Sequence, residues 1–210
     1  AYSCWDFTKN EQKQFEALQR LYESGSINCN EMLDLANIYM HRFDYDKAIR
    51  LYMECAEKFD SAGAFWNLGS LYQNGLTQNG KADIKKAISY YEKSAKIGYL
   101  AAKEDLVNIY LGIGDKEIVP FINNSEAKKY IDNILQEEKL LGGLYLTLWY
   151  CLSNDFSTAR EILENIDFSE SDSLQKLHGF FSLFLFKTLH SVSFFISIEQ
   201  IMMLLFNKEM

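Results

Sequence analysis

Residues 64–102 decide the fold, and they read AFWNLGSLYQNGLTQNGKADIKKAISYYEKSAKIGYLAA. Leu68 and Tyr72 are four residues apart, a spacing that puts both side chains on one face of a helix. The small residue Gly69 lets a neighbouring helix come close, and Ala87 does the same from a second helical run. The stretch therefore predicts two helices that pack against each other as a pair.

The same pattern recurs along the chain at a period typical of helical repeats. A leucine followed four residues later by a tyrosine begins at Leu35, Leu68, Leu106 and Leu146, and the alanines of the second helical runs are Ala48, Ala87, Ala127 and Ala159. The leucine-to-alanine separation is 13 residues in the outer repeats and 19 and 21 in the middle two, which predicts longer loops there. Because one pair cannot bury its apolar face alone, the pairs are expected to stack.

Composition supports an all-α chain. Hydrophobic residues make up 48% and aromatic residues 15% of the 210 residues, and Pro120 is the single proline. A β-sandwich needs many more turn-forming residues.

The second repeat carries a family resemblance. It combines Ala64, Leu68-Gly69, Tyr72, Gly75, Asp83, Lys86-Ala87, Tyr90-Tyr91, Gly98 and Ala102. This set resembles the Sel1-like repeat, a relative of the tetratricopeptide repeat. The resemblance covers roughly residues 30–167 and implies a right-handed superhelix (an α-solenoid) of about four antiparallel helix pairs. The third repeat is degenerate, since Val107 replaces the glycine.

Two flanking segments complete the predicted organisation. Residues 1–29 contain an N-terminal helix over residues 7–24 that ends at Gly25. Residues 168–210 hold two very apolar helices, expected either to pack on the last repeat or to offer a surface to a partner, a second copy or a lipid interface. Their uncharged runs stop near ten residues, short of the roughly 18 that a membrane span needs.

The net charge and the cysteines limit which classes of partner and which cellular compartments are compatible with the sequence. The net charge of −8 argues against nucleic-acid binding. Residues 101–170 carry 6 basic and 13 acidic side chains, so a basic partner surface would face this stretch. A Cys4–Cys29 disulfide is one interpretation and four free thiols is the other, with Cys55 and Cys151 read as buried thiols. A start at Ala1 fits signal-peptidase cleavage, hence a periplasmic or envelope location, or an artificial start in a cytoplasmic protein.

Catalytic motifs are missing from the sequence. It contains no HExxH, GxSxG, phosphate loop or GxGxxG, and we predict no enzymatic activity, no cofactor and no metal site.

The predicted functional feature is a binding groove. In the family that this chain resembles, the first helix of each pair lines the concave side. That placement implies groove residues Asn37, Met40, His41, Trp66, Ser70, Gln73, Asn74, Glu104 and Asn108. Amide side chains suit hydrogen bonds to a partner's backbone, and Trp66 is either an interface anchor or a packing residue.

These residues favour a non-catalytic protein-interaction module. The narrower expectation is a bacterial envelope immunity protein that binds and inhibits a toxic effector enzyme of type VI secretion, with a phospholipase as the prey. The alternatives are an adaptor or scaffold and, more remotely, an enzyme or small-ligand binder.

Overall fold

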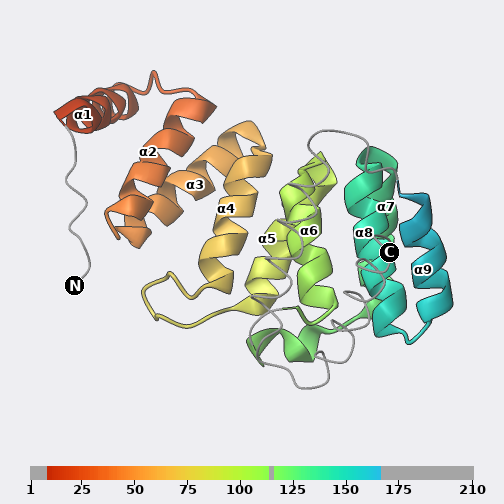
Figure 1. Cartoon of the computed structure of the whole chain (residues 1–210). Helices are drawn as coiled ribbons and strands as arrows, with labels where there is room; N and C mark the ends of the chain where they lie inside the picture. The colour runs from red at the N-terminus through yellow and green to blue at the C-terminus, as the bar shows by residue number, and fades with distance from the viewer. Residues whose placement is uncertain (1–8, 114–115, 167–210) are drawn as a thin grey trace. The chain divides into compact units, whose positions relative to one another are not determined.

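The computed structural model describes residues 9–113 and 116–166, and all regular secondary structure in these ranges is helical (Figure 1). The prediction of an all-α chain is confirmed for this part of the protein. The elements are α1 (Lys9–Glu23), α2 (Cys29–His41), α3 (Tyr45–Phe59), α4 (Ala62–Gln73), α5 (Ile84–Ile97), α6 (Leu100–Tyr110), a 3-10 helix (Lys116–Phe121), α7 (Asn124–Glu137), α8 (Lys139–Leu152) and α9 (Phe156–Asn165).

All eight predicted repeat runs fall in helices. The predicted partners pack on each other in α2 with α3, α4 with α5 and α8 with α9, and α6 contacts α7 through the Lys103–Glu137 ion pair and the stacked rings of Tyr110 and Tyr130. The loops follow the predicted lengths. Residues 42–44 join the first pair and 153–155 the last, whereas 74–83 join α4 to α5 and 111–123 join α6 to α7. The predicted N-terminal helix is confirmed over Lys9–Glu23, and Gly25 follows it with a φ of 71° and an N–H that donates to the Tyr22 carbonyl.

Short polar side chains define most of the helix starts. The N-cap residue accepts a hydrogen bond from a backbone N–H of the first turn in six helices, at Asn28, Asp44, Ser61, Asp83, Asn123 and Asp155. At α2 the bond is reciprocal, because the Glu31 carboxylate accepts from the Asn28 N–H. Each such cap satisfies a donor that the helix itself leaves open, so these positions set where the helices begin.

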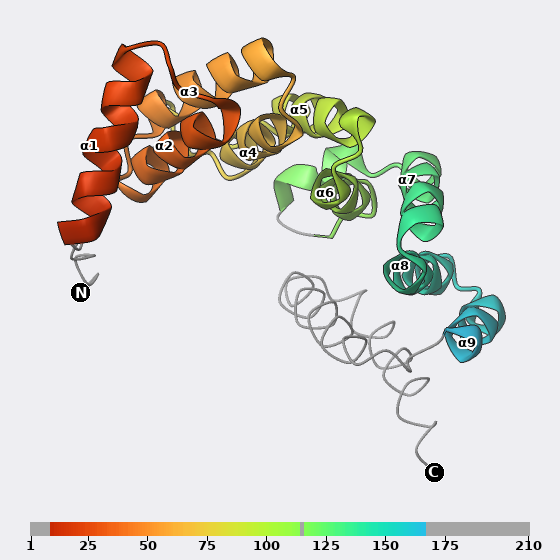
Figure 2. The ribbon, with the colours of Figure 1, turned by 90° about the horizontal axis from the view of Figure 1, so that it is seen from above.

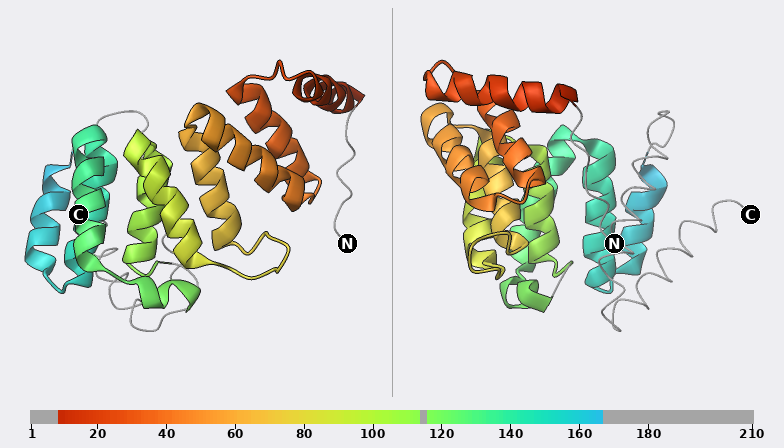
Figure 3. Two further views of the ribbon diagram at one scale, coloured as in Figure 1. Left: turned by 180° about the vertical axis from the view of Figure 1, so that it is seen from behind. Right: turned by 90° about the vertical axis from the view of Figure 1, so that its left-hand side faces the viewer.

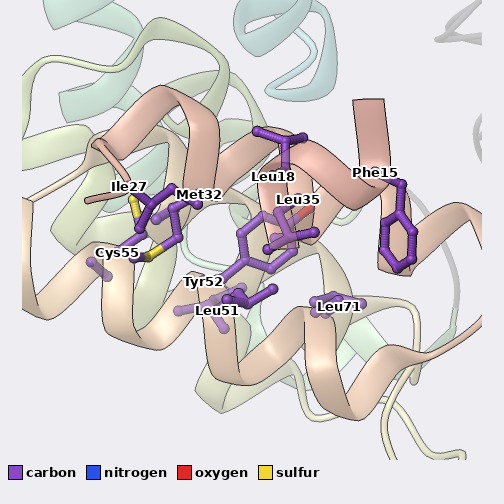
Figure 4. Packing of buried hydrophobic residues seen from close by; sticks show 14 residues of the cluster. Phe15, Leu18, Ile27, Met32, Leu35, Leu51, Tyr52, Cys55 and Leu71 are labelled. Atoms are coloured by element: carbon purple, nitrogen blue, oxygen red, sulfur yellow. The ribbon is translucent and has the colours of Figure 1, made fainter. Parts of the chain in front are cut away.

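The chain divides into two compact units, residues 1–102 and 103–210, and α6 crosses the boundary. In the first unit each helix from α1 to α5 packs on the next, and Figure 2 shows α1 beside α2. A core cluster joins α1 to α4, with Phe15, Leu18, Met32, Leu35, Leu51, Tyr52, Cys55 and Leu71 among its members (Figure 4).

The predicted close approach at the small residue after the repeat leucine is confirmed in the second pair. A Cβ added to Gly69 would lie 2.6 Å from two ring carbons of Tyr91, so the Tyr91 ring occupies the space that a side chain would need. The absence of a side chain at Gly69 thus decides how closely α5 approaches α4.

In the second unit α7, α8 and α9 pack consecutively and lie side by side (Figure 3). Gly142 of α8 sits against the Leu135 backbone of α7 so tightly that a Cβ there would collide with it. Lys103 of α6 is only 5% exposed, and its ammonium lies 2.5 Å from the Glu137 carboxylate at the end of α7. The predicted apolar helices within residues 168–210 lie outside the described residues. Among the described helices none is long and apolar enough to cross a bilayer.

Candidate binding face

The predicted groove amides of the first unit hold tyrosine hydroxyls. Asn37 Oδ1 on α2 accepts a hydrogen bond from the Tyr52 hydroxyl on α3 at 2.5 Å. Gln73 Oε1 on α4 accepts one from the Tyr91 hydroxyl on α5 at 2.7 Å. Both tyrosines are buried, and burial raises the pKa of Tyr52, which keeps its hydroxyl protonated as the donor. Successive helix pairs are thus closed by the same bond, from a second-helix tyrosine to a first-helix amide.

This bond also orients the amide. Because the oxygen is turned toward the tyrosine, the nitrogen must point the other way, and an amide nitrogen carries two donors. Asn37 and Gln73 are half-buried, and within the described part of the chain their nitrogens have no hydrogen-bond partner. The first unit therefore presents two donor groups whose direction is set from inside the protein.

Two further predicted groove residues, Met40 and Ser70, lie beside these amides in the helical register. Both are half-buried, and Met40 packs against the core cluster of the first unit. A Cβ added to Gly63 of α4 would lie 3.7 Å from the side chain of Leu33 on α2. The first helices of the two successive pairs, α2 and α4, are therefore close to each other at this point. We call Asn37, Met40, Ser70 and Gln73 the amide face.

Two predicted groove residues lie at helix ends. His41 is exposed and is the last residue of α2. Asn74 is exposed and donates from its side-chain nitrogen to the Ser70 carbonyl at 2.8 Å, an acceptor at the end of α4 that also receives the Asn74 backbone N–H. The Asn74 amide nitrogen is therefore engaged by a carbonyl of its own helix, α4.

Trp66 is half-buried, and its ring centroid lies 5.7 Å from that of Tyr99. The pair fits the packing interpretation of Trp66, although Tyr99 keeps 37% of its surface exposed.

In the second unit, the predicted groove residue Asn108 is buried. The expectation that Asn108 presents its amide to solvent is wrong, because Asn108 is 4% exposed and hydrogen-bonds the buried Tyr145 hydroxyl of α8. Glu104 is half-buried and its carboxylate lies 3.5 Å from the same hydroxyl. Burial and the charge of Glu104 raise the pKa of Tyr145, so this tyrosine also stays protonated and donates.

The equivalent apolar positions of the second unit are core residues. Leu111, Leu144, Leu148 and Cys151 occupy the same repeat positions as the groove residues and are all buried. All four residues lie in or directly after the predicted helices, but their apolar side chains are buried in the core and do not face solvent. The amide face is therefore confined to the first unit.

Two hollows have linings that include no residue of the amide face. One, of 300 Å³, is lined by α1, α2 and α3 and includes Gln19, Tyr22, Lys47 and Arg50. The other, of 980 Å³, is lined by α7, α8 and α9 and reaches Ile166, the last described residue. Among the described residues there is no group of three or more metal-ligating side chains.

The predicted Cys4–Cys29 bridge involves Cys4, which lies outside the described residues. Cys29 is a free thiol in this structure and its sulfur faces Cys55. Cys55 and Cys151 are buried thiols, as predicted.

The tyrosine partners of the amides were missed by the sequence reasoning. Tyr52 and Tyr91 each lie four residues after the repeat alanine, Ala48 or Ala87, and this shared spacing was the signal available. No known family model matches the chain, so membership of the Sel1-like family stays a prediction.

Proposed function

We propose that this protein is a non-catalytic protein-binding module and that the amide face of its first unit is the contact surface. One observation carries the proposal: Tyr52 and Tyr91, buried at equivalent positions of successive helix pairs, hold the amide oxygens of Asn37 and Gln73, which leaves the amide nitrogens as donors. Stacking of these pairs into a right-handed Sel1-like superhelix is part of the proposal. The consecutive packing of α2 to α5 supports it.

The chemistry of the face indicates the kind of partner. Outward amide nitrogens donate hydrogen bonds, and the acceptors that every protein segment offers are its backbone carbonyls. Donors held in place lose little conformational entropy on binding, which favours affinity. Met40, three residues after Asn37 on α2, adds a flexible apolar side chain to the face. The face therefore suits a protein segment whose carbonyls are exposed.

The narrower form of the proposal is an envelope immunity protein that blocks a secreted toxic enzyme such as a phospholipase. Its support is the repeat pattern and the net charge of −8, which suits a basic partner. Inhibition by masking needs an interface of about 1,600 Å². Capture without inhibition would instead indicate an adaptor or scaffold.

The test uses isosteric substitutions that separate binding from folding. Asn37→Asp and Gln73→Glu keep the oxygen that accepts the tyrosine hydroxyl but replace the donor nitrogen with a second acceptor. We expect the N37D/Q73E protein to remain folded by circular dichroism and to lose its partner. The partner is identified by affinity capture from extracts and secreted fractions of the native organism, and its dissociation constant is then measured by calorimetry with both purified proteins.

The matched control is Asn79→Asp. Asn79 is exposed in the loop between α4 and α5, and its side-chain oxygen accepts from Thr77 and from the Lys81 N–H, so the change has the same chemistry away from the amide face. We expect N79D to bind like the wild type and N37D/Q73E to bind at least tenfold more weakly. Equal binding by both would exclude the amide face, and failure of the wild type to bind any protein would exclude the module.

A further inference from the structure

Two cysteines of the first unit lie in direct contact. Cys29 is the first residue of α2 and Cys55 lies in the second half of α3. Their sulfur atoms are 3.0 Å apart, and the Cys55 thiol lies 3.7 Å from the Cys29 carbonyl. A disulfide bond is about 2.05 Å long, so the sulfurs need to approach by only about 1 Å to reach bonding distance. Side-chain rotation can supply a movement of this size.

The two thiols differ in access. Cys55 is fully buried in the core cluster, where Figure 4 shows it near Met32 and Ile27, whereas Cys29 is half-buried at the start of its helix. Burial, together with the hydrogen bond to Cys29, raises the pKa of the Cys55 thiol to about 12. Cys55 is therefore protonated at neutral pH and screened from solvent, and a reagent in solution meets Cys29 first.

We propose that Cys29 and Cys55 form a redox-active dithiol that closes to an intramolecular disulfide by exchange with a disulfide reagent, either a small molecule or an oxidoreductase. The Cys29 thiolate attacks one sulfur of the reagent and releases the other as a thiolate. Cys55 then loses its proton and attacks the Cys29 sulfur, which displaces the second half of the reagent. The protein loses two hydrogens and two electrons, and the reagent is reduced to two thiols.

The bond would fasten the start of α2 to α3 and close the chain between residues 29 and 55. Cross-linking a loop of this length restricts the unfolded chain, and we expect the oxidised first unit to melt roughly 15 °C above the reduced one. The predicted Cys4–Cys29 bridge would compete for the same thiol. The two pairings are mutually exclusive within one chain, because both use Cys29.

Tryptic peptides distinguish the pairings without ambiguity, because each cysteine falls in its own peptide: residues 1–9, 21–42, 51–58 and 140–160. The reduced full-length protein is equilibrated with oxidised glutathione, alkylated under denaturing conditions and digested. We expect a cross-link between peptides 21–42 and 51–58, with Cys4 and Cys151 alkylated. A cross-link between 1–9 and 21–42, or four alkylated cysteines, would overturn the proposal.

Single substitutions test the order of the two steps. Cys4→Ser and Cys151→Ser should form the 21–42 to 51–58 link as the wild type does. Cys55→Ser should keep one glutathione on Cys29, and Cys29→Ser should leave Cys55 unmodified in the folded state, with circular dichroism confirming that each variant is folded. Loss of the link in Cys4→Ser would refute the direct pairing, and rapid modification of Cys55 in folded Cys29→Ser would refute the role of Cys29 as the entry thiol.

Discussion

Replacing Gly69 with alanine tests whether contact across the second helix pair limits the stability of the first unit. The added Cβ would lie 2.6 Å from ring carbons of Tyr91, where ordinary contacts are 3.4–4 Å, so the ring must move by about 1 Å. Tyr91 is 1% exposed and its hydroxyl is bonded to Gln73 at 2.7 Å. The ring therefore has little space to move into, and movement strains its hydrogen bond.

The expected magnitude follows from three contributions. Overpacking in a tight core costs about 1–3 kcal/mol. Weakening the Tyr91–Gln73 bond costs up to about 1 kcal/mol. Because alanine has a higher helix propensity than glycine, the substitution also stabilises the helix by about 1 kcal/mol. The net loss in the free energy of unfolding is about 0–3 kcal/mol, equivalent to a melting temperature lower by up to roughly 15 °C for a unit of this size.

The assay is urea unfolding followed by far-ultraviolet circular dichroism, with Gly63→Ala as the matched control. Gly63 lies on the same helix, but its added Cβ meets only Leu33 at 3.7 Å, an ordinary contact. We expect Gly63→Ala to be neutral or stabilising by up to about 1 kcal/mol. Leucine at position 91 is smaller than tyrosine and relieves the clash with the added Cβ. The double variant G69A/Y91L should therefore lose less stability than the sum of the losses in G69A and Y91L. Stability of G69A equal to that of G63A would refute the steric argument.

Three other contacts give predictions. Tyr52→Phe removes the hydroxyl that donates to Asn37, and we expect the free energy of unfolding, measured in urea, to fall by about 1–2 kcal/mol. Unchanged stability would show that this hydrogen bond contributes nothing. Glu137→Ala leaves the buried Lys103 ammonium without its carboxylate, and we expect a loss of about 2–3 kcal/mol that shrinks when Lys103→Met is added; an equal loss in both would contradict the ion-pair argument. Burial raises the pKa of Cys151 from 9.0 to about 11, so the unfolded chain ionises this thiol first and stability falls as the pH rises from 9 to 11. Cys151→Ala should flatten that part of a plot of the urea midpoint against pH, and an unaltered slope would exclude this thiol as a cause.

The helices and their pairing could be read from the sequence because they depend on local spacing. Leucine and tyrosine four residues apart mark one helix face at Leu35, Leu68, Leu106 and Leu146, and all four runs are helical. The longer loops of the middle repeats follow from the leucine-to-alanine separation, and Gly25 ends the first helix through its positive φ. Periodicity, caps and glycine are properties of neighbouring residues, so a single sequence expresses them directly.

The side-chain pairs depend on tertiary packing, and the sequence did not reveal them. The helical register put Asn37 and Asn108 in the same place of their repeats, yet Asn37 is half-buried against Tyr52 whereas Asn108 is enclosed beside Tyr145 of another helix pair. The contact between Cys29 and Cys55 joins residues 26 apart. Local periodicity states which face of a helix a residue occupies, whereas the residue that it meets depends on how the helices pack.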